Sequence, residues 1–187
     1  NDSIDLDASG STRNDSITLQ HIFRHGAAMR VVWGAELRRE QIASPPIYNT
    51  QETLVTDFSR LFANAEWRIT PNWLLNAGLM AENSSDSGSS LAPRVMLNWH
   101  VLPGHTLRAG LARAYRPPSV LEKRGDIRYS YKGTLLLVST LARGNIEPES
   151  VLVRELGLLS EFPALGLSLD ARAFQERING FITRKQY

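Results

Sequence analysis

The chain has 187 residues, with 21 Lys and Arg against 19 Asp and Glu, so its formal net charge at pH 7 is only +2. No block of about five or six like charges occurs, which argues against nucleic acid as a partner. There is no Cys, so disulfide frameworks, thiol nucleophiles and Cys-ligated metal sites are excluded.

Apolar and polar residues alternate with a period of two along most of the chain, which predicts strands rather than helices. Between Leu61 and Ile69 the odd-numbered positions are apolar, whereas Asn64, Glu66 and Arg68 are polar. We therefore predict an all-β fold, an antiparallel meander of about eight long, tilted strands. In chain order, strands are expected at residues 15–24, 28–40, 55–69, 73–83, 92–101, 105–115, 149–161 and 166–180.

The predicted connections alternate between short and long. They are short at 25–26, 71–72, 103–104 and 163–164, and long at 41–54, 84–91 and 116–148. Bacterial outer-membrane barrels have this asymmetry, with strands of ~9–11 residues, although a soluble β-sandwich can also show it. No apolar run approaches the ~18–20 residues of a transmembrane helix, which excludes helical spans only.

The polar face of the predicted strands carries charges of both signs. Its members are Glu66, Arg68, Glu82, Arg94, Arg108, Glu155, Asp170, Arg172 and Glu176. Two interpretations stay open for this face, because periodicity alone does not separate them. It lines the lumen of a membrane barrel, or it is the solvated exterior of a soluble sandwich.

Several motifs follow one another in an order that is typical of one family. They are Ala77–Glu82, Ala92–Trp99, Ala114–Ser119 with Glu122, Gly144–Glu149, Glu155–Gly157 and Ala173–Ile182. With these motifs, the region from about Arg60 to Ile182 resembles the late barrel of a TonB-dependent outer-membrane receptor of the siderophore-receptor type. Two departures are that Met80 stands where the family usually has Arg, and that Ile146-Glu147 replaces a longer Pro-x-Leu-Lys segment.

The resemblance implies that residues 1–187 are part of a larger transmembrane β-barrel, with no plug domain and no signal peptide in this sequence. Barrels of this kind close with about 22 strands. It further implies a location in the cell outer membrane of a Gram-negative bacterium and TonB-energised uptake of a scarce ligand. The implied partners are the TonB complex, reached through the plug, outer-membrane lipid and lipopolysaccharide, and a small-molecule metal chelate such as a ferric siderophore.

The resemblance also implies roles for single residues. Plug contacts are expected for Arg116, Glu82, Arg108 and Glu155, although Arg116 can equally be a loop residue beside two prolines that stiffen the strand end. In loop 116–148, cations and phenols suited to an anionic chelate are Arg124, Arg128, Tyr129, Tyr131 and Lys132. The alternative is that these side chains decorate a solvated loop or face anionic lipopolysaccharide.

Signatures of catalysis or metal binding are lacking in the sequence. His21 and His25 have the spacing that chelates a metal on a helix, but on a strand four residues span about 13 Å. No nucleophile elbow or phosphate-binding Gly loop occurs, so neither an enzyme nor a cofactor site is expected. The rival functions are a passive porin-like or small eight-stranded outer-membrane barrel and a soluble β-sandwich binding module.

Overall fold

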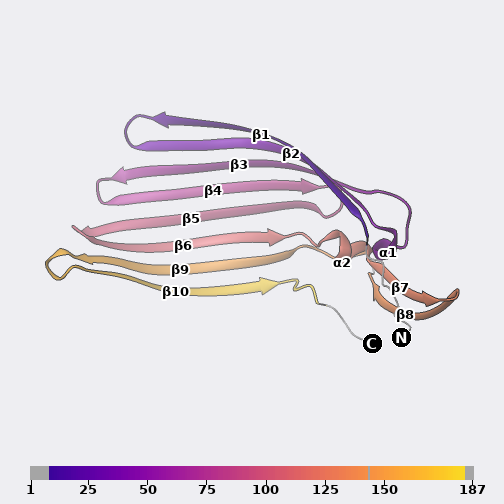
Figure 1. Cartoon of the computed structure of the whole chain (residues 1–187). Coiled ribbons are helices and arrows are strands. Elements are labelled where there is room, and N and C mark those ends of the chain that lie inside the picture. Colours follow the sequence, from indigo (N-terminus) through magenta and orange to yellow (C-terminus); the bar gives the residue numbers. More distant parts are fainter. Residues whose placement is uncertain (1–8, 143, 184–187) are drawn as a thin grey trace.

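The computed structural model describes residues 9–142 and 144–183. The ends of the predicted 1–187 domain, and with them the expected lack of a signal peptide, lie outside this part. Eight antiparallel strands form one sheet in the order β1-β2-β3-β4-β5-β6-β9-β10, and β7 pairs with β8 in a separate hairpin. Figure 1 shows the sheet as a single curved layer, with the hairpin projecting from one end. The predicted antiparallel meander is confirmed.

The strands of the large sheet are β1 (Ser11–His25), β2 (Met29–Ala43), β3 (Leu54–Thr70), β4 (Trp73–Ser84), β5 (Gly88–Leu102), β6 (His105–Arg116), β9 (Glu149–Phe162) and β10 (Leu167–Asn179). The hairpin consists of β7 (Asp126–Tyr131) and β8 (Thr134–Leu141). Short helical segments are α1 (Pro45–Tyr48), α2 (Val120–Arg124) and the 3-10 turn η1 (Pro163–Leu165). No helix in the described part of the chain is long and apolar enough to cross a membrane.

One predicted long connection was wrong, and another contains more secondary structure than expected. The expected loop 84–91 is a tight turn, because β4 runs to Ser84 and β5 begins at Gly88. The hydroxyl of Ser84 accepts hydrogen bonds from the amides of Asp86 and Ser87, so polar residues close this turn. The expected loop 116–148 contains α2 and the β7–β8 hairpin, which raises the number of strands in the described residues to ten.

The large sheet has one apolar face that nothing in the described part of the chain covers. None of the described hydrophobic side chains is buried. Leu61, Leu79 and Leu156 on three separate strands are 63%, 46% and 65% exposed. A soluble β-sandwich would bury this face against a second sheet. The single layer therefore favours contact with lipid over the sandwich interpretation.

The described sheet is also open, since β1 and β10 are its two edges and do not pair with each other. A closed eight-stranded barrel requires its first and last strands to be hydrogen-bonded neighbours. The arrangement in Figure 1 is thus that of a segment of barrel wall, not of a small closed barrel.

Bulges beside two tight turns keep the apolar residues of neighbouring strands on the same face. In the β3–β4 hairpin, Thr70 pairs with Trp73, and a ladder continued from that pair would set odd residues of β3 opposite even residues of β4. The apolar residues of the two strands would then lie on opposite faces. A register shift between Arg68 and Thr70 prevents this, and the β5–β6 hairpin has a matching shift between His100 and Leu102.

Candidate functional site

On the polar face, one arginine joins three strands through two carboxylates. Register places Glu36 of β2 opposite Arg60 of β3, and Arg60 opposite Glu82 of β4. Arg60 Nε donates to Glu82 Oε2 at 2.9 Å, and Arg60 Nη1 donates to Glu36 Oε2 at 3.1 Å. Glu82, one of the predicted plug contacts, is therefore held within the wall by a residue that our sequence reasoning missed. The signal was available, because Arg60 shares the even parity of Asn64 and Glu66.

A second ion-paired group lies toward the other edge of the sheet. Arg108 Nε lies 3.1 Å from Glu155 Oε1, and Arg108 Nη2 lies 3.4 Å from Asp170 Oδ1. Arg108 crosses Gly157, the residue opposite it on β9, where an added Cβ would lie 2.8 Å from Arg108 Cγ. The structure thus brings the predicted plug contacts Arg108 and Glu155 together. It also explains Gly157 as room for a neighbouring arginine, a role that we did not predict.

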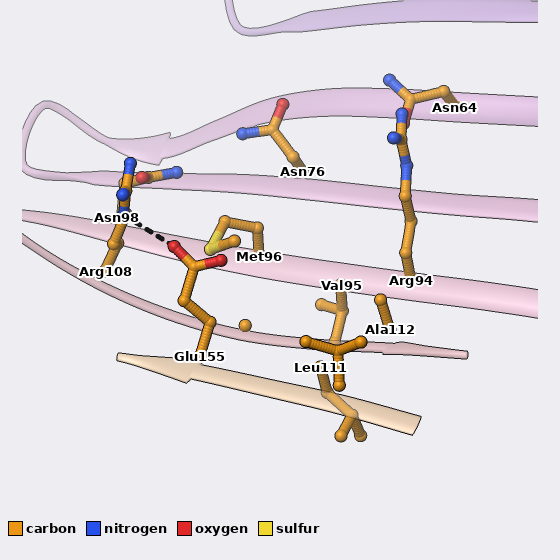
Figure 2. Close-up of a pocket in the computed structure, with 12 residues that line it drawn as sticks. Asn64, Asn76, Arg94, Val95, Met96, Asn98, Arg108, Leu111, Ala112 and Glu155 are labelled. Carbon is orange, nitrogen blue, oxygen red and sulfur yellow. Dashed lines mark hydrogen bonds and ion pairs between the residues drawn. The ribbon is translucent and has the colours of Figure 1, made fainter. Parts of the chain in front are cut away.

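Between the two groups the polar face has a hollow of about 460 Å³. The side chains around it come from β3, β4, β5, β6 and β9 (Figure 2). The polar residues that line it are Asn64, Asn76, Arg94, Asn98, Arg108 and Glu155, with Met96 between them. Arg94 Nη2 donates to Asn64 Oδ1 at 2.9 Å. Amides, a guanidinium and a carboxylate together offer both donors and acceptors, which suits contact with another polypeptide segment.

Arg116 ends β6 and organises the start of the long connection. Its Nε donates to Glu149 at 2.7 Å, while its two terminal nitrogens donate to Glu122 at 3.1 Å each. Glu122 also accepts a hydrogen bond from the amide of Ser119, and the Ser119 hydroxyl in turn caps the start of α2. The hydrogen bonds from Arg116, and then those from Ser119, lower the pKa of Glu122 below its usual value. Arg116 thereby links two strands and a helix, and its plug contact stays a prediction.

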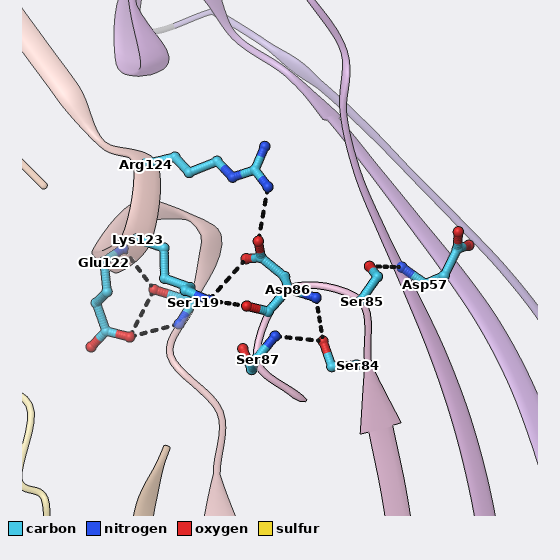
Figure 3. A network of polar contacts seen from close by, with 9 residues as sticks. All are labelled: Asp57, Ser84, Ser85, Asp86, Ser87, Ser119, Glu122, Lys123 and Arg124. Carbon is cyan, nitrogen blue, oxygen red and sulfur yellow. Dashed lines mark hydrogen bonds and ion pairs between the residues drawn. The ribbon is translucent and has the colours of Figure 1, made fainter. Parts of the chain in front are cut away.

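The turn between β4 and β5 is joined to α2 by hydrogen bonds. Asp86, between β4 and β5, accepts a hydrogen bond from Arg124 Nη2 at 2.8 Å, and its main-chain oxygen accepts one from Lys123 Nζ. Ser85 Oγ accepts from the amide of Asp57 at 3.0 Å, which ties the same turn to β3. Figure 3 shows Arg124 and Lys123 converging on Asp86. This serine-rich turn, which we predicted as part of a long connection at 84–91, is an anchor for the connection between β6 and β9.

The five predicted ligand-binding residues do not converge on one point. Arg124 faces Asp86 at the base, and Arg128 is paired with Asp126 at 2.7 Å in β7. That pairing, with a further hydrogen bond from Asn49, lowers the pKa of Asp126. These two cations are therefore neutralised by the protein itself.

The other three predicted residues lie farther out on the hairpin. Tyr129 is partly covered and pairs with Leu137, whereas Tyr131 is 53% exposed at the tip. Lys132 has a φ of 48° in the turn, and its Nζ lies 5.2 Å from the centre of the Tyr131 ring. Tyr131 and Lys132 are thus the predicted residues best placed to meet a molecule from outside.

The sequence model of the protein family described as TonB dependent receptor-like, beta-barrel matches residues 2–187 of this chain. The chain belongs to this family. The TonB-dependent receptor resemblance drawn from the motifs is therefore confirmed.

Solved structures share the fold of this receptor chain at low sequence identity. The siderophore receptor PirA from Pseudomonas aeruginosa matches with a TM-score of 0.75 and 18% identity, over 89% of this chain and 31% of its own. A mutant of the ferric enterobactin receptor PfeA from the same organism matches with a TM-score of 0.75 and 18% identity, over 90% of this chain and 27% of its own. The FrpB iron transporter from Neisseria meningitidis matches with a TM-score of 0.65 and 12% identity, over 90% of this chain and 29% of its own.

A curated relative is the iron-regulated outer membrane virulence protein of Vibrio cholerae, which is 25% identical over 66% of this chain and 18% of its own length. The chain thus spans about a third or less of the proteins that it matches. The family and this relative place it in the outer membrane of a Gram-negative bacterium. The family is one of transport receptors, not of enzymes.

Membership in the family orients the TonB-dependent receptor sheet. Short turns of outer-membrane barrels face the periplasm, and longer connections face the exterior. The ends that carry α1, α2 and the β7–β8 hairpin are accordingly extracellular (Figure 1). In barrels of this kind the apolar face is the outer surface and the polar face lines the lumen.

Proposed function

We propose that residues 1–187 form part of the barrel wall of a receptor for TonB-energised uptake of a ferric siderophore or a similar chelate. The observation that supports this most is the combination, in a family member, of a lipid-facing apolar surface with a luminal face that is charged and hollowed. The structural neighbours include proteins described as siderophore and ferric enterobactin receptors. The TonB complex would act on a plug that this wall encloses.

The luminal hollow is the proposed plug contact. Asn76 and Asn98 place amide groups there, and Arg108 with Glu155 closes one side (Figure 2). Of the four predicted contacts, Arg108 and Glu155 border this hollow, Glu82 belongs to the group around Arg60, and Arg116 lies at the extracellular end.

Ligand contact is proposed for the extracellular hairpin. Tyr131 and Lys132 would meet the chelate first, with Tyr129 beside them on β7, and Arg124 and Arg128 would hold the hairpin in place. An anionic chelate suits this pair, because a cation and a phenol combine charge with stacking. The same end of the barrel would lie next to outer-membrane lipid and lipopolysaccharide.

The test is uptake of radioactive iron, supplied as a panel of ferric siderophores, by cells that express the receptor containing this chain. Uptake should require TonB, and it should fall when Tyr131→Ala and Lys132→Ala are combined. Ser130→Ala, in the same strand, is the matched control because its small side chain leaves the tip unchanged. Uptake that continues in cells without TonB would refute active transport and favour a passive channel.

A further inference from the structure

Three arginines lie on the lipid-facing side of the sheet near its extracellular end. Arg113 of β6 pairs with Leu152, and Leu152 pairs in turn with Arg177 of β10. Arg154 of β9 lies two residues farther along, opposite Leu111. The three side chains therefore share the face of the exposed apolar residues, and we name Arg113, Arg154 and Arg177 the rim cluster.

The rim cluster has no carboxylate partner among the described residues. Arg154 donates to Gln175 Oε1 at 3.5 Å, and the guanidinium carbon of Arg113 lies 4.9 Å from the centre of the Tyr115 ring. No hydrogen bond or ion pair of Arg177 occurs within 9–142 and 144–183. Like charges held together without an acid repel one another, and an external anion would relieve that repulsion.

Arginines at the same end of the strands, but near the opposite edge of the sheet, do have carboxylate partners. Arg39 of β2 shares the lipid-facing side, and its Nε lies 2.7 Å from Asp57 Oδ1. Arg13 of β1 is likewise paired with Asp15 at 2.7 Å. The protein neutralises these two cations itself, so among the described strands the unpaired rim cluster is a local feature of β6, β9 and β10.

The spacing of the rim cluster suits a phosphate group. Neighbouring strands lie ~4.8 Å apart and each residue advances ~3.4 Å, so the three Cα atoms form a triangle with edges of about 8–10 Å. Flexible arginine side chains can close that gap, and a guanidinium matches phosphate oxygens with two parallel donors. The cluster could therefore hold one phosphate between its members or two phosphates side by side.

Apolar surface continues directly below the cluster toward the membrane centre. Leu111 and Leu156 are 45% and 65% exposed, and Leu156 lies two residues beyond Arg154 on the same face. A ligand that suits the whole surface has a phosphorylated head at the arginines and acyl chains along the leucines. We propose that the rim cluster binds the phosphorylated head of lipid A, the membrane anchor of lipopolysaccharide. This assignment deepens the lipopolysaccharide contact of the proposed function and rests on the orientation given there.

The experiment measures lipid binding to the purified receptor that contains this chain, in a neutral detergent, by native mass spectrometry. The titrants are bis-phosphorylated lipid A, the same lipid with its phosphates removed, and inorganic phosphate. The receptor should bind phosphorylated lipid A at least about tenfold more tightly than either of the others, since charge-assisted hydrogen bonds are the strong ones. Equal binding of the dephosphorylated lipid would overturn the proposal, and so would saturation by inorganic phosphate alone.

The decisive variant combines Arg113→Gln, Arg154→Gln and Arg177→Gln. Its affinity for phosphorylated lipid A should fall about tenfold or more, whereas Arg39→Gln, which removes a cation that Asp57 already neutralises, should leave it unchanged. Unchanged affinity in the triple variant would overturn the proposal. Heat-modifiable gel mobility checks folding, and if the triple variant fails that check, the exposed single change Arg154→Gln must by itself weaken binding.

Uptake assays on the same variants separate this inference from the proposed function. Loss of lipid A binding with normal chelate uptake would support the rim site independently of what the receptor carries. TonB-independent uptake by the wild-type receptor would refute the proposed function and leave the lipid affinities as they are.

Discussion

Replacing Arg60 by Met tests whether the luminal ion pairs stabilise the barrel wall. The arginine makes three hydrogen bonds to Glu36 and Glu82, and the side chains of the three residues are only 26%, 18% and 10% exposed. Methionine keeps most of the aliphatic stem, so the change mainly removes the cation. Two carboxylates of like charge would then share a poorly solvated strip of sheet without a partner.

The expected loss of stability follows from that burial. Removing one partner of a fully buried ion pair costs ~3–5 kcal/mol, whereas a solvent-exposed pair contributes little. The Arg60 group lies between these limits, so we expect the free energy of unfolding to fall by about 2 kcal/mol. A loss of that size raises the ratio of unfolded to folded protein by about 30-fold.

The assay is urea unfolding of the receptor in detergent micelles, followed by tryptophan fluorescence and by heat-modifiable mobility. Arg39→Met is the matched control, because its pair with Asp57 is exposed and its loss should hardly move the unfolding midpoint. Adding Glu36→Gln and Glu82→Gln to Arg60→Met should recover part of the loss by removing the unpaired charges. If Arg60→Met is no more harmful than Arg39→Met, the luminal ion pairs do not stabilise the wall.

Three further predictions concern the glycine contact and the extracellular connection. Gly157→Ala should destabilise the receptor by ~1–3 kcal/mol in the same unfolding assay, because the new methyl group meets the Arg108 side chain, and in an Arg108→Ala background the same change should cost little further stability. Since Arg116 lowers the pKa of Glu122, the contribution of that pair to stability is complete above the ordinary Glu pKa of about 4.5 and is lost as pH falls below it. The protection factors of the α2 amides, which are exchange rates corrected for the intrinsic pH dependence of exchange, should therefore fall at acid pH in the wild type but show no such pH step in Glu122→Gln. Asp86→Asn should weaken the ionic contacts of α2 and make the connection several-fold more sensitive to trypsin, and an unchanged cleavage rate would exclude the anchoring role.

Parity was enough to predict the large sheet, because its strands alternate over most of their length, although Ile22, Leu74 and Phe174 are apolar residues on the polar face. It was not enough for the β7–β8 hairpin. Register shifts next to Arg128 and next to Tyr129 break the alternation in β7, and Leu135, Leu136 and Leu137 form a continuous apolar run in β8. A turn signal was nevertheless present, since both central residues of Lys132-Gly133 have positive φ, as a two-residue hairpin requires.

The identity of site residues was harder to predict than their side of the sheet. Alternation put Glu82, Arg108 and Glu155 on the polar face, but their partners depend on register, and register depends on two bulges that periodicity does not reveal. Without the bulge at Arg68, Arg60 would lie opposite Asn83 instead of Glu82. The pairing of the loop cations was equally impossible to predict, because a cation in a loop can be free or ion-paired and only the fold shows which.

A wall in which none of the described hydrophobic side chains is buried can still hold a defined alignment of its strands. Each strand of the described sheet contacts its neighbours through backbone hydrogen bonds and through side chains of adjacent strands, and its apolar face is exposed. Lipid offers no hydrophobic driving force for strand association beyond what the side chains already have. A one-residue slip would turn the polar side chains of a strand to the apolar side of the sheet, and it would also separate Arg60 from two carboxylates and Arg108 from Glu155. The hydrophobic pattern and the ion pairs of the polar face thus fix the alignment of the strands together, and this alignment gives the hollow and the extracellular hairpin their positions.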